Sequence, residues 1–359
     1  MKANKWEWSE FYVFLKILED KKLPAANKKL EIIPDKFFIF QKVIRNETKQ
    51  EEKNYNLENW DVLIFDNKNI LLKTIKEKEI KWKTLKIFER IQQSSTWTFQ
   101  IPEAEKLMKK LLCTQIKAAS LEKPDINAVI YDRVSEREEL LGFSIKSMLG
   151  WASTLLNAGK TTNFIFQIKD LDSSLINQIN KIDGRSKIQD RLSEIFKNGG
   201  NLFFKKVANQ QFESNLKKID TVFASFVAEM LLNFFSGKAT KISDLTNLLW
   251  ENPNLKNNYW LTVEDYEFKM KNFLVSVALG MVPSKNWDGF TKAHWWYIVV
   301  KENGEVICYH LYNRDEFLAY LYENTKFESA SSTRHDYGKI FTEWNELFIN
   351  LNLQIRFLK

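Results

Sequence analysis

Cysteine and histidine are scarce in this chain of 359 residues, which contains two cysteines and three histidines. Cys113 and Cys308 cannot form a disulfide framework, and the scattered His294, His310 and His335 add no Cys/His metal set. No serine or cysteine lies in a nucleophile-elbow motif, so a hydrolase triad is not indicated. The low cysteine content fits a protein of the reducing cytosol.

Long apolar runs are also missing. The most apolar run, residues 222–235, is too short for a bilayer and contains Glu229. The first residues form a charged amphipathic stretch and not an apolar signal sequence. Gly159-Lys160-Thr161 is not a phosphate-binding loop, because Thr154 stands where that motif needs a glycine. We therefore expect a cytoplasmic protein with no membrane partner.

The overall composition is that of a globular protein, with 44% hydrophobic and 28% charged residues. Lysine and arginine number 53 against 46 acidic residues, which gives a net charge of +7. This excess permits a polyanionic partner but does not demand one, because the field depends on how the charges cluster.

Hydrophobic periodicity predicts a mixed α/β protein. A helix is expected over residues 7–19, where Trp8, Phe11, Leu15 and Leu18 share one face. Further helices are predicted at 83–93, 102–113, 172–182, 186–197, 210–236, 243–250, 263–278 and 314–324. Strands are predicted at 37–45, 62–65, 70–74, 126–131, 140–146, 164–169, 297–300, 306–312, 339–342 and 347–357. The pattern indicates one integrated unit over 1–359, with a core at 1–170, a helical insertion at 171–280 and a C-terminal β-rich part at 281–359.

Residues 124–147 are the stretch most suggestive of chemistry. The strands at 126–131 and 140–146 flank a charged turn, which predicts a hairpin. If the turn centres near residues 135–136, Asp125 lies opposite Lys146. A carboxylate there holds a hard divalent cation, while a lysine orients or deprotonates a water and steadies charge on a phosphate.

Pro124-Asp125 together with Ser144-Ile145-Lys146 resembles the pattern of the PD-(D/E)XK nucleases, with Ser144 where an acid is usual. Such a pairing also arises by chance in a lysine-rich chain, so a solvated surface hairpin is the competing interpretation. Gln167-Ile168-Lys169 is a second candidate for the lysine element. It is the weaker one, because Asp125 then loses its hairpin partner.

The hairpin is one carboxylate short of a metal site, because a serine hydroxyl is a poor substitute for an acid. The helix at 7–19 offers Glu7 and Glu10, and a helix packed on a sheet can direct one carboxylate to a strand end. We favour Glu10 as the second ligand and leave Glu7 as the alternative.

Polar and basic residues in two other regions are candidate DNA contacts. One region follows Lys146 directly, and the other lies near the end of the chain, where arginines can read guanine edges. Taken alone, such residues are more often parts of surface loops. The candidates are Ser153, Thr154, Asn157, Asn313, Arg314, Arg334 and His335.

Over nearly its full length the sequence resembles the HpaII family of type II restriction endonucleases. The resemblance rests on co-ordered segments at 4–10, 142–147, 153–158, 162–164, 304–314, 333–335 and 351–357. It implies a PD-(D/E)XK core and Mg²⁺-dependent double-strand cleavage of DNA within CCGG, blocked by cytosine methylation. It further implies a bacterial restriction–modification system, with a paired cytosine methyltransferase that the enzyme does not contact.

The resemblance assigns roles to the candidate residues. Asp125 and Glu10 would hold Mg²⁺, Lys146 would position the attacking water, and Ser144 would hydrogen-bond within the site. Because CCGG is palindromic, a homodimer with two symmetric sites is expected.

Tryptophans mark the departures from the family's pattern. Trp6 stands where a glycine precedes Glu-Trp-Ser-Glu, and Trp295-Trp296 stand where a Gly-Gly pair precedes a strand. Trp151 also occupies a position where small residues are usual. Because tryptophan cannot replace glycine at a left-handed or crowded position, the alternative function is a catalytically weak or inactive sequence-specific DNA-binding protein.

Overall fold

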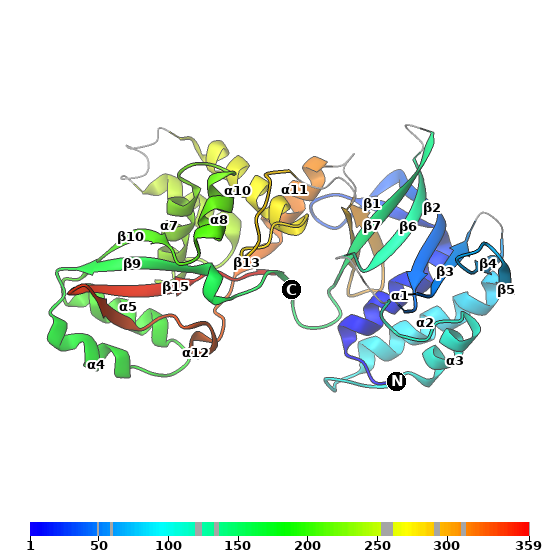
Figure 1. Ribbon diagram of the computed structural model, residues 1–359, viewed down its shortest axis with the longest axis horizontal. Coiled ribbons are helices and arrows are strands. Elements are labelled where there is room, and N and C mark those ends of the chain that lie inside the picture. The colour runs from blue at the N-terminus through cyan, green and yellow to red at the C-terminus, as the bar shows by residue number, and fades with distance from the viewer. Residues whose placement is uncertain are drawn as a thin grey trace. The chain divides into compact units, whose positions relative to one another are not determined.

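The structure is a computed structural model that describes residues 1–48, 50–57, 60–118, 124–132, 136–252, 261–290, 295–309 and 314–358. Its contacts divide the chain into two compact units, both shown in Figure 1. Unit 1 comprises Met1–Ser153 and Ala293–Phe317, and unit 2 comprises Thr154–Lys292 and Leu318–Leu358. Among the described residues no helix combines the length and the apolar content needed to cross a membrane.

Unit 1 is built on a nine-stranded mixed sheet with the order β1-β12-β11-β7-β6-β2-β3-β4-β5. Its strands are β1 Lys22–Ala26, β2 Ile32–Asn46, β3 Glu52–Asn56, β4 Val62–Phe65, β5 Leu71–Ile75, β6 Ile126–Asp132, β7 Arg137–Ser147, β11 Trp295–Val300 and β12 Val306–Tyr309. β1 pairs with both β12 and β2. The strands β1, β12, β11, β7, β6 and β2 therefore close on one another as a small barrel.

The helices of unit 1 are α1 Lys5–Asp20, α2 Glu77–Gln93 and α3 Pro102–Lys110. They lie together beside the sheet (Figure 1). Asn4 precedes α1 and its side chain forms a capping box with Glu7, while the apolar residues of the helix are buried, including Trp8 and Phe11. These side chains join the β-sheet residues Phe143 and Ile145 in one continuous core. Because the buried residues of α1 are apolar and recur at helical spacing, this helix could be predicted from the sequence.

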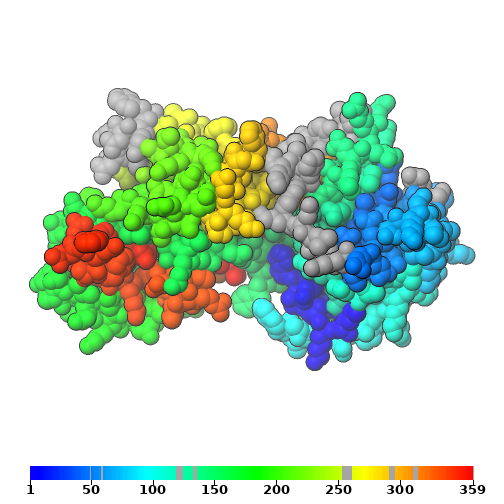
Figure 2. Space-filling view, viewed as in Figure 1, coloured from blue at the N-terminus to red at the C-terminus, as the bar shows by residue number. Residues whose placement is uncertain are grey.

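The β6–β7 ribbon has one exposed and one buried end. Its turn end projects from the rest of unit 1 in Figures 1 and 2, and residues 137–140 of β7 are exposed. Toward the other end Leu141, Phe143 and Ile145 are buried. Asp125 lies just before β6 at this buried end, close to α1.

Unit 2 contains a four-stranded sheet, β10-β9-β15-β14, and a three-stranded sheet, β13-β16-β8. Its strands are β8 Thr154–Leu156, β9 Asn163–Lys169, β10 Asn201–Val207, β13 Thr325–Phe327, β14 Ile340–Glu343, β15 Glu346–Asn352 and β16 Ile355–Phe357. Its helices are α4 Ile176–Lys181, α5 Lys187–Lys197, α6 Gln210–Lys217, α7 Phe223–Phe235, α8 Ile242–Glu251, α10 Val263–Ala278 and α12 Ser332–His335. α11, Arg314–Glu323, begins in unit 1 and ends in unit 2.

The expected mixed α/β architecture is confirmed, but several boundaries differ. The helix predicted at 210–236 is two helices, α6 and α7. The final strand predicted at 347–357 is β15 and β16, which belong to different sheets. The strands that were not predicted are β1, β3, β8, β10 and β13. The boundaries at 170 and 280 do not match the two units, because β9 pairs with β10 and β15 whereas β11 pairs with β7.

Candidate functional site

The end of the β6–β7 hairpin fixes Asp125 through its main chain and its side chain. The Asp125 amide donates to the Phe143 carbonyl at 2.8 Å, and the Ile145 amide donates to Asp125 Oδ2 at 2.9 Å. One carboxylate oxygen is thus held by the neighbouring strand. The other, Oδ1, remains for a cation.

The predicted register of the hairpin was two residues out. Asp132 pairs with Arg137 and Ile126 pairs with Phe143, so continuation of the ladder places Asp125 opposite Ser144 and not opposite Lys146. The pairing centres the hairpin one residue earlier than expected. A shift of this centre by one residue changes the position opposite Asp125 by two residues. Residues two apart on a strand share a face, so Ser144 and Lys146 still project on the face of Asp125.

Glu10 reaches the same place from α1. Its side chain is buried, with the residue 6% exposed, and Glu10 Oε1 accepts a hydrogen bond from Lys117 Nζ at 3.0 Å. Lys117 Nζ also donates to Asp125 Oδ1 at 3.3 Å. The two carboxylates expected from the sequence therefore meet at one shared ammonium.

Glu7, the alternative acid, has a local role. Its Oε2 accepts from the Asn4 amide at 2.9 Å, and its own amide donates to Asn4 Oδ1 at 3.0 Å. This reciprocal pair satisfies amides at the start of α1 that would otherwise be unpaired. The geometry therefore favours Glu10 over Glu7 as the second acid.

A buried hydroxyl pair joins α1 to the end of β7. Ser9 Oγ donates to the Lys5 carbonyl at 2.7 Å and lies 2.8 Å from Ser147 Oγ. Because the Ser9 proton is already used, Ser147 donates to Ser9, and it accepts from the Leu149 amide at 3.1 Å. The residues Ser9 and Ser147 adjoin Glu10 and Lys146 in sequence, so this contact fixes the acid relative to the lysine.

Lys146 lies among aromatic rings. Its Nζ is 5.6 Å from the centre of the Trp6 ring and 5.5 Å from that of Tyr297. The negative faces of such rings attract an ammonium at these distances. Trp6, one of the departures from the family's pattern, therefore borders the candidate site.

Burial and charge shift the pKa values of both main candidates. The pKa of Glu10 is raised to about 7, chiefly by burial and next by the Asp125 carboxylate, while Lys117 opposes the rise. Burial lowers the pKa of Lys146, against the opposing effect of Asp125 and Glu10. Burial thus disfavours the charged form of both groups, and a bound cation would offset the carboxylate charge.

The chemistry of the acidic pair fits a metal ion. Glu10 Oε2 is buried and has no hydrogen-bond partner among the described residues. A buried oxygen of that kind is costly unless something pairs with it. No group of three or more His, Cys, Asp and Glu converges within the described residues. Two carboxylates suit Mg²⁺, which usually keeps several waters and takes one or two protein carboxylates plus substrate phosphate.

The proposed DNA-contacting residues are distributed over both units. Ser153, in unit 1, is 3% exposed and donates to the Ser147 carbonyl at 3.4 Å, so its hydroxyl serves an internal contact. Arg314, also in unit 1, is exposed at the start of α11, whereas Asn313 lies outside the described residues.

The other candidates belong to unit 2. Asn157 and Arg334 are exposed, while Thr154 and His335 are part-buried. The His335 carbonyl accepts from Asn163 Nδ2 at 2.9 Å. Of the candidates that the structure describes, only Ser153 and Arg314 therefore share a unit with Asp125 and Lys146.

The second lysine candidate, Lys169, lies in a different sheet from Asp125. β9 pairs with β10 and β15 in unit 2, and Lys169 Nζ lies 5.1 Å from the centre of the Phe203 ring. β9, the strand of that assignment, therefore belongs to a different sheet from the β6–β7 hairpin. The hairpin lysine, Lys146, is the one that shares a sheet with Asp125.

The remaining tryptophan departures have different environments. Trp296 is 2% exposed and packs against Phe38 and Phe143, with ring centres 5.1 and 5.5 Å away. Trp151 is 74% exposed. The side chain of Trp295 lies outside the part that the structure describes. Trp296 is thus a core residue of the sheet.

Sequence reasoning missed Lys117. It lies after α3 in a stretch with no motif, and its contacts with Glu10 and Asp125 arise only from tertiary structure. No periodicity or spacing could have identified it.

Comparison with known proteins shows the family of the chain. The sequence model of the HpaII restriction endonuclease family matches residues 4–357. The type II restriction enzyme HpaII of Haemophilus parainfluenzae is 39% identical over 363 residues, covering 99% of this chain and 98% of that protein. No solved structure matches the chain.

These matches place the protein among the type II restriction endonucleases, which are site-specific deoxyribonucleases of restriction–modification systems. Within that class, the chain belongs to the HpaII restriction endonuclease family, as its sequence segments predicted.

Proposed function

We propose that this restriction enzyme makes Mg²⁺-dependent double-strand cuts within CCGG and is blocked by cytosine methylation of that site. The chemical part of this proposal rests on one observation. Glu10 and Asp125 both contact the ammonium of Lys117, beside the strand that bears Lys146. The proposed sequence specificity rests on the family and on the 39% identical type II restriction enzyme HpaII.

Glu10 and Asp125 would hold the metal, in a catalytic core of the PD-(D/E)XK type. When bound, Mg²⁺ supplies positive charge to the scissile phosphate and lowers the pKa of water. Asp125 is held in a position that suits this role. The Ile145 amide binds Asp125 Oδ2, and Asp125 Oδ1 shares Lys117 with Glu10 Oε1.

Lys146 positions the attacking water and stabilises the charge that develops on the pentavalent phosphorane. Burial lowers the pKa of Lys146, which makes it easier for the side chain to lose its proton and, as an amine, to accept one from that water. The water oxygen bonds to phosphorus in line with the departing 3′ oxygen, which leaves a 5′-phosphate. Ser144, on the same face of β7, hydrogen-bonds within the site.

DNA recognition would use residues of both units. The exposed Arg314, Arg334 and Asn157 are suited to base edges or phosphates. Thr154 and His335 would approach the backbone, and Ser153 would support the segment that leads to them. A palindromic site calls for two symmetric active sites, so the bound form is a homodimer.

In the cell, the enzyme would act in the bacterial cytoplasm beside a cognate cytosine methyltransferase. The methyltransferase would protect the host sites without contacting the nuclease, since both read the same DNA sequence independently.

Plasmid digestion tests the specificity. The full chain is incubated with unmethylated and with CpG-methylated plasmid, each with and without Mg²⁺. The proposal predicts discrete fragments that end within CCGG, from unmethylated plasmid with Mg²⁺ alone. Fragments from methylated plasmid, or ends at another sequence, would contradict it. A gel shift at CCGG without any cleavage would instead support the alternative of a catalytically inactive binding protein.

A further inference from the structure

Lys117 covers the acidic pair from the solvent side. Its side chain is 47% exposed, whereas the side chains of Glu10 and Asp125 are 7% and 16% exposed. One ammonium thus contacts both carboxylates, at 3.0 Å and 3.3 Å. The proposed metal would be held by these same two carboxylates.

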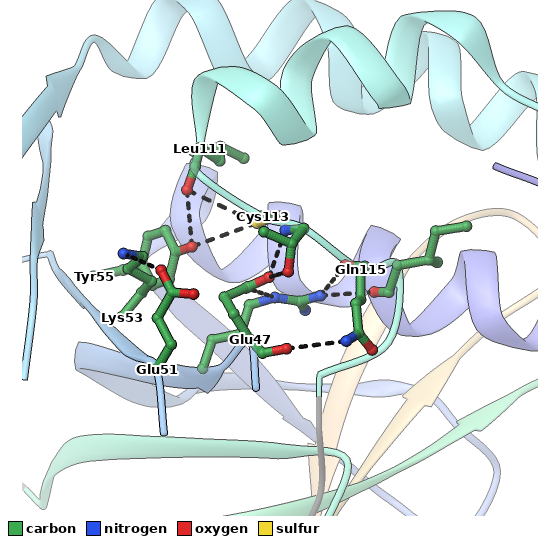
Figure 3. A network of polar contacts seen from close by, with 10 residues as sticks. Glu47, Glu51, Lys53, Tyr55, Leu111, Cys113 and Gln115 are labelled. Carbon is green, nitrogen blue, oxygen red and sulfur yellow. Dashed lines mark hydrogen bonds and ion pairs between the residues drawn. The ribbon is translucent and has the colours of Figure 1, made fainter. Parts of the chain in front are cut away.

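A buried ion pair fastens the main chain just before Lys117. Arg45 and Glu47 are almost fully buried, and Arg45 Nε donates to Glu47 Oε1 at 2.7 Å. Arg45 Nη2 also donates to the carbonyls of Gln115 and Ile116, the latter at 3.0 Å. Figure 3 shows Glu47 and Gln115 in this network of polar contacts.

Glu47 also binds this segment through its second carboxylate oxygen. Glu47 Oε2 accepts from the Thr114 amide and, at 2.7 Å, from Thr114 Oγ1. Gln115 Nε2 donates to the Glu47 carbonyl at 3.0 Å. We call Arg45 and Glu47 the clamp. It holds the main chain of residues 114–116, while the four-carbon side chain of Lys117 extends beyond it and can turn about its own bonds.

We propose that Lys117 is a resident counter-cation that holds Glu10 and Asp125 together before the metal binds, and that it competes with the metal for them. Without a cation, two carboxylates this close repel one another at a largely buried site. A divalent ion bound to both carboxylates would need the space between Glu10 and Asp125 that the ammonium fills. Metal loading therefore requires Lys117 to turn away, and the clamp leaves that rotation open. This inference rests on the metal site of the proposed function.

Mn²⁺ binding to the full chain without DNA tests the competition, with bound Mn²⁺ measured by electron paramagnetic resonance. Lys117→Met keeps the length of the side chain and removes its charge. We expect it to bind Mn²⁺ about fivefold more tightly than the wild type, the size expected for loss of a part-exposed ion pair. Lys117→Arg, which restores a cation, should bind close to the wild-type level.

Lys110→Met is the matched control, since Lys110 pairs with Glu79 on the surface of the same unit. It should leave Mn²⁺ affinity unchanged, which separates a local effect of Lys117 from a loss of general charge. A Lys117→Met protein that binds Mn²⁺ no more tightly than the wild type would overturn the proposal.

Asp125→Asn distinguishes the two possible failures. If Asp125→Asn weakens Mn²⁺ binding but Lys117→Met does not tighten it, the counter-cation proposal alone is wrong. If Asp125→Asn binds as tightly as the wild type, or no protein binds Mn²⁺, the metal site itself is wrong.

Discussion

Glu10 and Glu7 lie one turn apart on α1, and their surroundings give them different tasks. Glu10 is buried beside Asp125, whereas Glu7 pairs with the Asn4 main chain. From the sequence alone, both acids were candidates, because spacing on a helix does not reveal which side chain closes its own cap. The contact with Lys117 could not be predicted at all, since it joins residues that are distant in sequence.

Substitution of each acid by its amide separates these tasks. Glu10→Gln keeps the shape but removes a charged metal ligand, so DNA cleavage should fall by more than about a hundredfold at saturating Mg²⁺. Glu7→Gln should retain cleavage and lose at most about 1 kcal/mol of unfolding free energy. Single-turnover cleavage and urea denaturation measure the two effects. Loss of cleavage in Glu7→Gln alone would reverse the assignment.

The raised pKa of Glu10 predicts how pH affects the metal-free protein. Folding raises this pKa from 4.5 to about 7. Between these values the folded state binds more protons than the unfolded state, so unfolding free energy falls as pH rises through the window. Below pH 4.5 the effect vanishes, because both states are protonated there.

Glu10→Gln removes this penalty. Without divalent metal, it should gain stability relative to the wild type at pH 8, on the order of 2 kcal/mol, and much less at pH 5. Urea unfolding at both pH values gives the difference. An equal effect of the substitution at pH 5 and pH 8 would show that burial does not perturb Glu10.

At the scale of elements, the β6–β7 hairpin depends on a close approach at Gly142. A Cβ there would lie 2.8 Å from the Cβ and Cγ of Pro124, the residue before Asp125. At Gly150 the nearest atom would be the Cβ of Lys5 at 3.5 Å, an ordinary contact. The two glycines therefore differ in whether a methyl group displaces the acidic end of the hairpin.

Gly142→Ala should push Pro124 and Asp125 away from β7. We expect a loss of about 1–3 kcal/mol of unfolding free energy and a cleavage rate reduced by at least about tenfold, because catalysis is sensitive to small displacements. Gly150→Ala is the control and should cut DNA like the wild type. Unchanged cleavage in Gly142→Ala would mean that Asp125 does not need its present position.

The elements that the sequence predicted well are those with a strong apolar pattern. They include α1 and the β11–β12 hairpin, whose strands are buried on both faces and which turns at Gly304 with φ +86°. The helix predicted at 210–236 was wrong because Asp220 interrupts it. Its Oδ1 accepts from the Val222 amide at 2.9 Å and its Oδ2 pairs with Lys269 at 2.6 Å. Such polar contacts override an apolar repeat.

At the scale of the whole molecule, sequence patterns predicted the mixed α/β class of the fold but not how its strands group into sheets and units. The six-stranded barrel closes because β1 pairs with both β12 and β2. No local sequence pattern predicts these pairings. Likewise, β11 and β12 are distant in sequence from the rest of unit 1, yet β11 lies beside β7 and pairs Val299 with Lys146. That the chain acts as one integrated nuclease, and as a dimer on DNA, stays a prediction.

The central claim is that Asp125, Glu10 and Lys146 in unit 1 form the active site. Its most direct test is single-turnover cleavage of an unmethylated CCGG duplex by Lys146→Ala and Lys169→Ala, with gel-shift binding as the control for DNA affinity. We predict that Lys146→Ala binds the duplex but cuts it about 10²–10⁴-fold more slowly, while Lys169→Ala cuts like the wild type. Normal cleavage by Lys146→Ala with loss of cleavage in Lys169→Ala would contradict the claim.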